Sequence, residues 1–174
     1  GHIKVNELHK YVLQYVYDCS NMIDKELVKT IVHLRSKYKI IIGVISSGFR
    51  LNIEKTLACL GLCVDFIEAN DFRISQTGHL YYDLHILDNK DIIFTKIIQT
   101  MNLKFEDVAY IGDDLNDVKC FKKAGYPIMS LLADHNQGEL LKQEPRLFCP
   151  RDQNEIARYL EDHIKEDFHE QFRD

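Results

Sequence analysis

The sequence has no apolar run long enough to cross a bilayer, no stripe of basic residues and no Cys-x-x-Cys pair. Its longest apolar run, Ile40–Ile45, contains Gly43, whereas a membrane-spanning helix needs about 20 apolar residues. The net charge of -5 and the scattered lysines and arginines argue against nucleic acid or an anionic membrane as the main partner. We therefore expect no nucleic-acid partner and no membrane partner.

The cysteines do not follow the pattern of a disulfide framework or a zinc site, because their number is odd and their spacing irregular. They are Cys19, Cys59, Cys63, Cys120 and Cys149. No signal peptide opens the sequence. We expect a reduced, cytoplasmic protein with structural thiols.

The composition is that of a globular protein: 45% of the 174 residues are hydrophobic and 28% are charged, which suits one domain with a real core. The near-continuous apolar run over Ile40–Ser46 is typical of a strand buried on both faces of a parallel sheet. Strand-like runs alternate with segments of helical periodicity along the chain. This order predicts an α/β fold with a parallel sheet and right-handed crossovers.

The predicted elements follow from periodicity and from the residues that begin and end each segment. Helices are predicted over Asn6–Cys19, Ile23–Lys39, Asn52–Gly61, Asp91–Met101, Val118–Ala124, Gly138–Glu144 and from Asp152 to about His163. Strands are predicted over Ile40–Ser46, Cys63–Ala69, Val108–Ile111, Pro127–Leu132 and Arg146–Pro150, with a hairpin over Phe72–Leu84.

Small polar residues follow the first predicted strand, where parallel sheets bind their ligands. Ser46, Ser47 and Gly48 lead directly into a helix start. A hydroxyl beside free backbone N–H groups at a helix N-terminus makes a good anion site. The alternative is that a serine here simply caps the helix.

Three acids in five positions follow the third predicted strand: Asp113, Asp114 and Asp117. Carboxylates at a strand end suit Mg²⁺, which binds one or two of them together with water and substrate phosphate. The alternative is that Asp114 or Asn116 caps the next helix and that the other acids are solvated.

Lys90 stands at the start of a predicted helix, where a cation is disfavoured. A bound phosphate oxygen or the acid cluster would compensate for this position. The alternative is a lysine whose charged end simply reaches solvent.

Three segments, in this order, resemble motifs of the haloacid dehalogenase superfamily of phosphohydrolases, in particular its phosphoserine-phosphatase-like branch. They are VISSGFRLNIEKTLACLGL, NKDIIFTKIIQTMNL and IGDDLNDVKCFKKAG. The resemblance implies a three-layer Rossmannoid parallel sheet with helices on both faces and a small β-hairpin insert. It makes residues 23–174 the core domain and residues 1–22 a remnant of a cap or an N-terminal helix.

The resemblance also implies roles for individual residues. Ser46, with Ser47 and Gly48, falls on the phosphate-binding turn, and Lys90 falls on the phosphate-binding lysine. Asp113 falls on the principal Mg²⁺ ligand, with Asp114 beside it, and Asp117 on the supporting acid that also holds the lysine. The implied activity is hydrolysis of a small phosphorylated metabolite through an aspartyl-phosphate intermediate.

The sequence departs from the family at the nucleophile motif, Asp-x-Asp-x-Thr, which does not occur in these 174 residues. The nearest candidate nucleophile is Asp18, with Ser20 and Met22 in place of the second Asp and the Thr. The helical periodicity of Asn6–Cys19 favours a cap helix instead, with the nucleophile strand upstream.

Two other classes remain open. One is a catalytically inactive relative that binds a phosphate ligand or a protein partner. The other is a receiver-type signalling domain, which is disfavoured because its acid pair precedes its lysine, whereas here the order is serine, lysine, acids.

Overall fold

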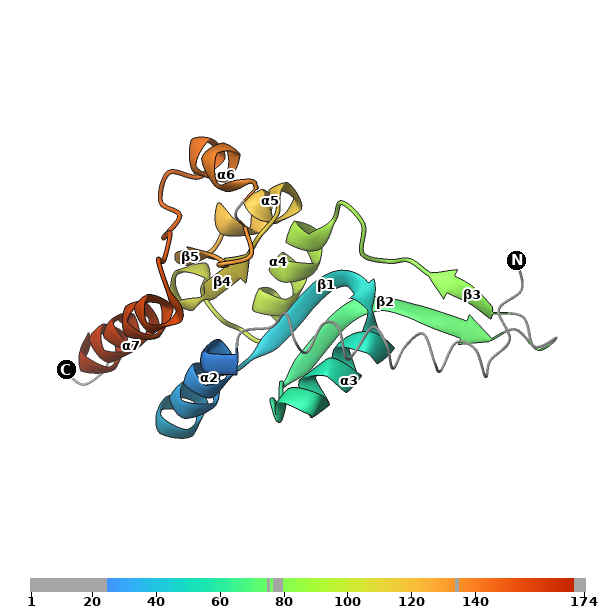
Figure 1. Ribbon diagram of the computed structural model, residues 1–174, viewed down its shortest axis with the longest axis horizontal. Helices are drawn as coiled ribbons and strands as arrows, with labels where there is room; N and C mark the ends of the chain where they lie inside the picture. The colour runs from blue at the N-terminus through green and yellow to red at the C-terminus, as the bar shows by residue number, and fades with distance from the viewer. Residues whose placement is uncertain (1–24, 75, 77–79, 134, 171–174) are drawn as a thin grey trace. The chain divides into compact units, whose positions relative to one another are not determined.

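The chain forms two compact units, which we describe one at a time. The computed structural model describes residues 25–74, 76, 80–133 and 135–170. The first unit comprises the described residues up to Arg35 together with Lys39–Leu87, and the second comprises Ser36–Tyr38 and the chain from Asp88 onward. Figure 1 labels the helices and strands of both units.

The first unit is built on a three-stranded sheet in the order β1-β2-β3. Strand β1 (Gly43–Phe49) pairs in parallel with β2 (Phe66–Ile74), and helix α3 (Arg50–Leu60) connects the two. Strand β3 (Leu80–Asp83) pairs antiparallel with β2, and helix α2 (Lys25–Tyr38) precedes β1 in the chain. Parallel strands joined through a helix are the expected α/β arrangement.

Helix α3 ends at Gly61, as the sequence predicts. Gly61 has a φ of 67°, in the left-handed region that glycine adopts without a steric penalty. The next two backbone N–H groups return to the last turn, from Gly61 to the Ala58 carbonyl and from Leu62 to the Leu57 carbonyl. This cap directs the chain out of the helix toward β2.

The first strand differs from its prediction in position and burial. It spans Gly43–Phe49 instead of Ile40–Ser46, and all its residues are half-buried or exposed. The expectation of burial on both faces is therefore wrong. The reason is its place at the edge of the sheet, because β2 is its only partner among the described strands.

The predicted hairpin is confirmed, although its first arm is not a separate strand. The expected strand over Cys63–Ala69 continues into that arm, so that β2 is a single strand over Phe66–Ile74. Its far half pairs with β3, with Phe72 opposite Tyr82. The same strand thus serves a parallel and an antiparallel neighbour.

The second unit contains a parallel pair of strands, β4 (Ala109–Gly112) and β5 (Tyr126–Met129). Between them run a 3₁₀ turn, η2 (Leu115–Asp117), and helix α5 (Val118–Phe121). The strand expected over Arg146–Pro150 is reduced to a single parallel bridge between Ile128 and Phe148. The other elements are α4 (Lys90–Thr100), η1 (Phe105–Asp107), α6 (Gln137–Gln143) and α7 (Gln153–Glu170). Parallel strands and helices in both units confirm the predicted α/β class.

Helix α5 ends at Phe121, earlier than the predicted Ala124, and the Arg146 guanidinium binds the carbonyl groups at and after this end. The acceptors, at 3.2–3.4 Å, are the main-chain oxygens of Phe121, Lys122 and Ala124. Arg146 is held in turn by the buried carboxylate of Glu144, whose Oε1 lies 2.9 Å from Arg146 Nε.

The last helix begins where the sequence predicts and ends later. Asp152 Oδ1 accepts the Glu155 N–H at 2.9 Å, which is the geometry of an N-cap. Helix α7 then continues to Glu170, beyond the predicted end near His163.

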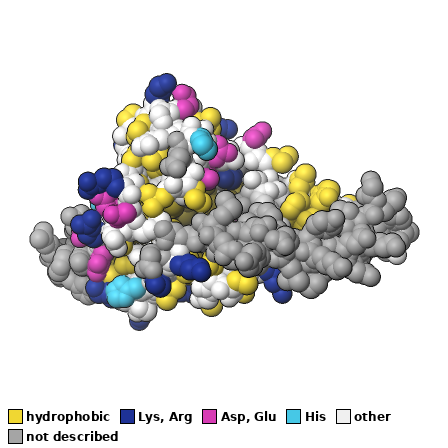
Figure 2. Space-filling model, viewed as in Figure 1, with side chains coloured by type: hydrophobic (Ala, Val, Ile, Leu, Met, Phe, Trp, Pro, Cys, Tyr) yellow, Lys and Arg dark blue, Asp and Glu magenta, His cyan; other side chains and the backbone are white. Residues whose placement is uncertain are grey.

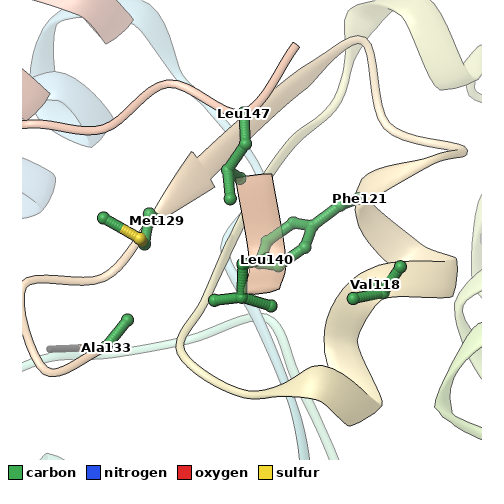
Figure 3. Packing of buried hydrophobic residues seen from close by; sticks show 6 residues of the cluster. All are labelled: Val118, Phe121, Met129, Ala133, Leu140 and Leu147. Atoms are coloured by element: carbon green, nitrogen blue, oxygen red, sulfur yellow. The ribbon is translucent and has the colours of Figure 1, made fainter. Parts of the chain in front are cut away.

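The core of the second unit lies around α5, β5 and α6 (Figure 3). It is made of Val118, Phe121, Met129, Ala133, Leu140 and Leu147. Phe121 and Leu140 are fully buried, and full burial of such a side chain stabilises by about 1.5–3 kcal/mol. Because α5 begins directly after Asp117, this packing also fixes the acid segment.

The surface carries charges of both signs. On the face shown in Figure 2, basic and acidic side chains are interleaved among the described residues, without a continuous basic stripe. Among the residues that the structure describes, four cysteines are free thiols: Cys59, Cys63, Cys120 and Cys149. In the described parts of the chain, none of the helices combines the length and apolar character that crossing a membrane requires.

The N-terminal segment, residues 1–22, and the candidate nucleophile Asp18 lie outside the described residues. The helix predicted over Asn6–Cys19 lies there too. The division into a remnant over residues 1–22 and a core over residues 23–174 therefore stays a prediction.

Replacing Leu140 by Ala should lower the free energy of unfolding by about 2–5 kcal/mol, because it leaves a cavity in a fully buried cluster. Urea denaturation measures the loss. The matched control is Leu132→Ala, at a site that is 58% exposed, which should change stability by less than about 0.5 kcal/mol. Equal losses in the two variants would contradict the packing described here.

Candidate functional site

A buried ion pair joins the first residue of α4 to the acid segment after β4. Lys90 Nζ lies 2.7 Å from Asp117 Oδ1 and 3.1 Å from Asn116 Oδ1. The Lys90 and Asp117 side chains are only 11% and 3% exposed. The carboxylate offsets the unfavourable position of a cation at a helix N-terminus. The expected contact between Lys90 and Asp117 is confirmed.

The Asp117 carboxylate accepts four hydrogen bonds. Oδ1 accepts from Lys90 Nζ and, at 2.8 Å, from the Tyr110 hydroxyl. Oδ2 accepts the backbone N–H groups of Asp113 and Asp114, each at 3.3 Å. Since a carboxylate offers about four acceptor positions, Asp117 is an anchor for its surroundings.

The backbone approaches this anchor closely at Gly112. A Cβ atom at that position would lie 2.7 Å from Asp117 Oδ2, which is closer than real Cβ contacts. Glycine at the end of β4 therefore lets the chain pass the buried carboxylate and turn into the acid segment.

Asp113 is the acid that remains open in this cluster. The residue is exposed, and no side chain among the described residues donates a hydrogen bond to its carboxylate. Partial removal of the carboxyl from water, followed by the nearby charge of Asp117, raises the pKa of Asp113 above the ordinary value. A cation beside Asp113 would relieve this strain on the ionised form.

Asp114 acts as a cap, which is the alternative that the sequence left open. Its Oδ1 accepts the Leu115 N–H at 2.7 Å and the Asn136 side-chain amide at 3.2 Å. With Asp117 it forms a capping box around η2. Its carboxylate is exposed, so a second role beside Asp113 stays compatible with this geometry.

Mg²⁺ fits the open part of this cluster. Among the residues that the structure describes, no group of three or more His, Cys, Asp or Glu side chains could hold a metal ion by itself. Mg²⁺ does not require such a group, because it usually takes one or two carboxylates and completes its shell with water and phosphate oxygens. Asp113, with Asp114 beside it, offers this donor set, whereas the acceptors of Asp117 are already filled. The three-acid metal site stays a prediction.

A second ion pair stabilises the same start of α4, and here the residue of α4 is the acid instead of the lysine. Lys123 Nζ lies 2.9 Å from Asp91 Oδ2 and also donates to the Asp91 carbonyl and the Thr95 hydroxyl. The hydrogen bond from Lys123 lowers the pKa of Asp91. The first turn of α4 is thus fixed by two neighbouring residues of opposite charge.

The predicted serine turn lies at the end of β1, in the first unit. Ser46 Oγ accepts the Gly48 N–H at 3.0 Å, so its own hydroxyl proton remains available to an acceptor. The N-cap of α3 is Phe49, without a side-chain cap. The alternative in which one of these serines caps the helix is therefore wrong.

The buried side chain of Asn70 stabilises this turn. It is 1% exposed, and its amide donates to the Ser47 carbonyl at 2.8 Å and to the Ile86 carbonyl at 3.0 Å. Its Oδ1 accepts the Ile86 N–H at 2.7 Å. One buried side chain thus fixes the serine turn and the segment that leaves the hairpin.

The structure brings the predicted residues together in two groups. Ser46, Ser47 and Gly48 form one group in the first unit. Lys90 and the three acids form the other in the second unit. Convergence of the two groups on one phosphate stays a prediction, as does the role of Asp18.

Three residues of these groups were missed by the sequence patterns: Asn70, Tyr110 and Asn136. In the sequence Tyr110 fits the pattern of an apolar residue in a buried strand. A buried tyrosine hydroxyl usually has a hydrogen-bond partner, and this rule could have indicated that Tyr110 has one. The hydrogen-bond partners of Asn70 lie 16 and 23 residues away in the sequence, and that of Asn136 lies 22 residues away. No local sequence pattern reveals contacts at such separations.

Comparisons with known proteins agree with this geometry. The family of haloacid dehalogenase-like hydrolases matches residues 3–125. The phosphoserine phosphatase of Methanocaldococcus jannaschii is 29% identical over 124 residues, covering 69% of this chain and 56% of that protein. This chain thus spans a little over half the length of that relative.

Solved structures give the same result. A substrate-bound phosphoserine phosphatase complex matches with a TM-score of 0.58 and 29% identity, over 75% of this chain and 60% of that one. A phosphoserine phosphatase in apo form matches with a TM-score of 0.54 and 27% identity, over 76% and 64% of the two chains. The chain therefore belongs to the haloacid dehalogenase-like hydrolases, on the phosphoserine-phosphatase-like branch.

Proposed function

We propose that this protein is a Mg²⁺-dependent phosphatase that hydrolyses a small phosphomonoester through an aspartyl-phosphate intermediate. The observation that carries the proposal is the buried Lys90–Asp117 pair with the open carboxylate of Asp113 beside it. The family match and the phosphoserine phosphatase relatives support the reaction class. The substrate is a small phosphorylated metabolite, and the free thiols support a reducing, cytoplasmic setting.

Lys90 supplies a fixed positive charge for a phosphate oxygen. Its ammonium group has three N–H donors, and two of them point to Asp117 and Asn116. The remaining donor is held in a defined direction by these two bonds. A charge that is already in place stabilises a transferring phosphoryl group without reorganisation.

The Ser46 turn supplies the second contact in this proposal. Because Ser46 Oγ already accepts the Gly48 N–H, its hydroxyl proton is free to donate to a phosphate oxygen. The Asn70 amide donates to the Ser47 carbonyl and so holds the backbone next to this group. The backbone N–H groups at the start of α3 add to the attraction for an anion.

Asp113, with Asp114 beside it, would hold Mg²⁺. A Mg²⁺ ion bound there supplies positive charge that neutralises the phosphate and orients it. Asp117 contributes indirectly, since it holds the backbone of Asp113 and Asp114 and the Lys90 amine.

In the proposed reaction an aspartate attacks phosphorus while the P–O bond to the leaving alcohol breaks, and water then hydrolyses the aspartyl phosphate. Within these 174 residues the candidate is Asp18, in a sequence that departs from Asp-x-Asp-x-Thr. A serine at position 20 is a poor acid at neutral pH and would protonate a leaving group badly. This departure supports a second candidate function, a catalytically inactive domain that binds phosphate or a partner.

Mg²⁺ should stabilise the wild-type chain, and Asp113→Asn should remove the effect. At about five times its Kd, a ligand of the folded state contributes about 1 kcal/mol, or roughly 2–4 °C in Tm. Differential scanning fluorimetry with and without Mg²⁺ measures this shift. Asp107→Asn, an exposed acid outside the cluster, is the matched control and should keep the full shift. An unchanged Mg²⁺ response in Asp113→Asn would move the metal elsewhere.

Without Mg²⁺, Asp113→Asn should raise Tm at neutral pH. Because the pKa of Asp113 is raised in the folded state, that state binds the proton more tightly than the unfolded chain does. Stability from this group is present below the ordinary Asp pKa and is lost as pH rises through the raised value. The Tm advantage of the variant should therefore shrink as pH falls through the raised pKa and should vanish below the ordinary Asp pKa. A constant difference across pH would contradict this origin.

The 174-residue chain should hydrolyse p-nitrophenyl phosphate very slowly, because holding a phosphate does not by itself accelerate attack. Loss of a nucleophile that works as part of a unit commonly lowers the rate by several orders of magnitude. Turnover is measured for the chain, for Asp18→Asn and for a longer form that adds a strand ending in Asp-x-Asp.

The three results separate the candidates. Robust turnover that Asp18→Asn abolishes would identify Asp18 as the nucleophile. Turnover only in the longer form would assign the nucleophile to the added strand. No turnover in any form would favour the inactive binding domain.

A further inference from the structure

Tyr110 lies where the core of the second unit meets the acid segment. Its ring packs edge-on against Phe94 and Phe121, with ring centroids 5.3 and 5.5 Å away. Its hydroxyl points out of this apolar contact and lies 2.8 Å from Asp117 Oδ1. The ring therefore fixes the place of the hydroxyl, and the hydroxyl meets the anchor of the site.

The oxygen that Tyr110 meets is the one that holds Lys90. Lys90 Nζ lies 2.7 Å from the same Oδ1, while Oδ2 takes two longer backbone bonds at 3.3 Å. Asp117 is 3% exposed, so water has little access to replace a lost donor. The direction of the carboxylate plane thus depends on the two short bonds to Oδ1.

We infer that Tyr110 is a positioning residue for the Lys90 amine. Its hydroxyl fixes the rotation of the Asp117 carboxylate, and the carboxylate fixes the direction of Lys90 Nζ. The inference deepens the proposed function. It rests on that proposal for one point, which is that the Lys90 amine binds a phosphate oxygen.

Core packing alone does not account for this hydroxyl. A phenylalanine would make the same edge-on contacts with Phe94 and Phe121, without a polar atom to satisfy. The Cys120 thiol is a second neighbour of the hydroxyl, and burial raises the pKa of this thiol to about 11, so it stays protonated. Because a phenol has one proton to donate and a carboxylate is the stronger acceptor, the proton goes to Asp117.

The test compares the wild type with Tyr110→Phe, which removes only the hydroxyl. The matched control is Phe121→Leu, which loosens the same ring cluster and leaves the hydroxyl in place. The first readout is the NMR signal of the Lys90 side-chain ammonium in ¹⁵N-lysine-labelled protein, assigned by its loss in Lys90→Met. Measuring Tm of each variant reports any general loss of stability, which would affect both Tyr110→Phe and Phe121→Leu.

In the wild type we expect a resolved Lys90 signal that exchanges slowly with water, because two of its N–H groups are bonded in a site that is 11% exposed. Tyr110→Phe should speed this exchange about tenfold or broaden the signal away, corresponding to the loss of one hydrogen bond to a charged group. Phe121→Leu should lower Tm and keep the signal. A signal unchanged in Tyr110→Phe, or absent from the wild type, would overturn the inference.

The second readout is the affinity for inorganic phosphate in the presence of Mg²⁺, by titration calorimetry. Tyr110→Phe should weaken it about tenfold, whereas Phe121→Leu should leave it within about twofold. A wild type that binds no phosphate, with a Lys90 signal that still responds to Tyr110→Phe, would overturn the proposed function and retain the positioning role. Equal affinity in the wild type and Tyr110→Phe would overturn the link from Tyr110 to phosphate binding.

Discussion

The structure of the second unit depends on one buried carboxylate. Asp117 receives the Lys90 ammonium, the Tyr110 hydroxyl and the backbone of Asp113 and Asp114. Removing one partner of a buried ion pair typically costs about 3–5 kcal/mol, because the other charge is left without compensation. The same interaction therefore keeps a helix start, a strand end and a tight turn in one arrangement, and this arrangement leaves Asp113 open.

The three acids of the site, Asp113, Asp114 and Asp117, have different roles although they carry the same charge. Three acids within five residues would repel one another if all were equally free. Asp117 is neutralised by Lys90, Asp114 is bound as a cap, and Asp113 keeps an unfavourable ionised form. Charge that the fold leaves uncompensated at one position is what a cation or a charged ligand can use.

Local sequence patterns predicted what local chemistry decides. The helix end at Gly61 follows from backbone preferences, and the pairing of Lys90 with Asp117 follows from the family resemblance. The burial of β1 was predicted wrongly, because it depends on which strand lies beside it, and that is a long-range property. The hydroxyl of Tyr110 was overlooked for a similar reason, since a strand pattern shows which face a side chain occupies and not what its tip meets.

Asn70 closes the base of the hairpin, since it binds both backbone groups of Ile86. The strand pairing of β2 with β3 begins next to this buried amide, with Asp71 opposite Asp83. A loop closed at its base tolerates change at its tip, because each doubling of its length costs only about 0.6 kcal/mol in closure entropy. The hairpin is thus a module that related chains could lengthen, shorten or exchange while the serine turn beneath it stays in place.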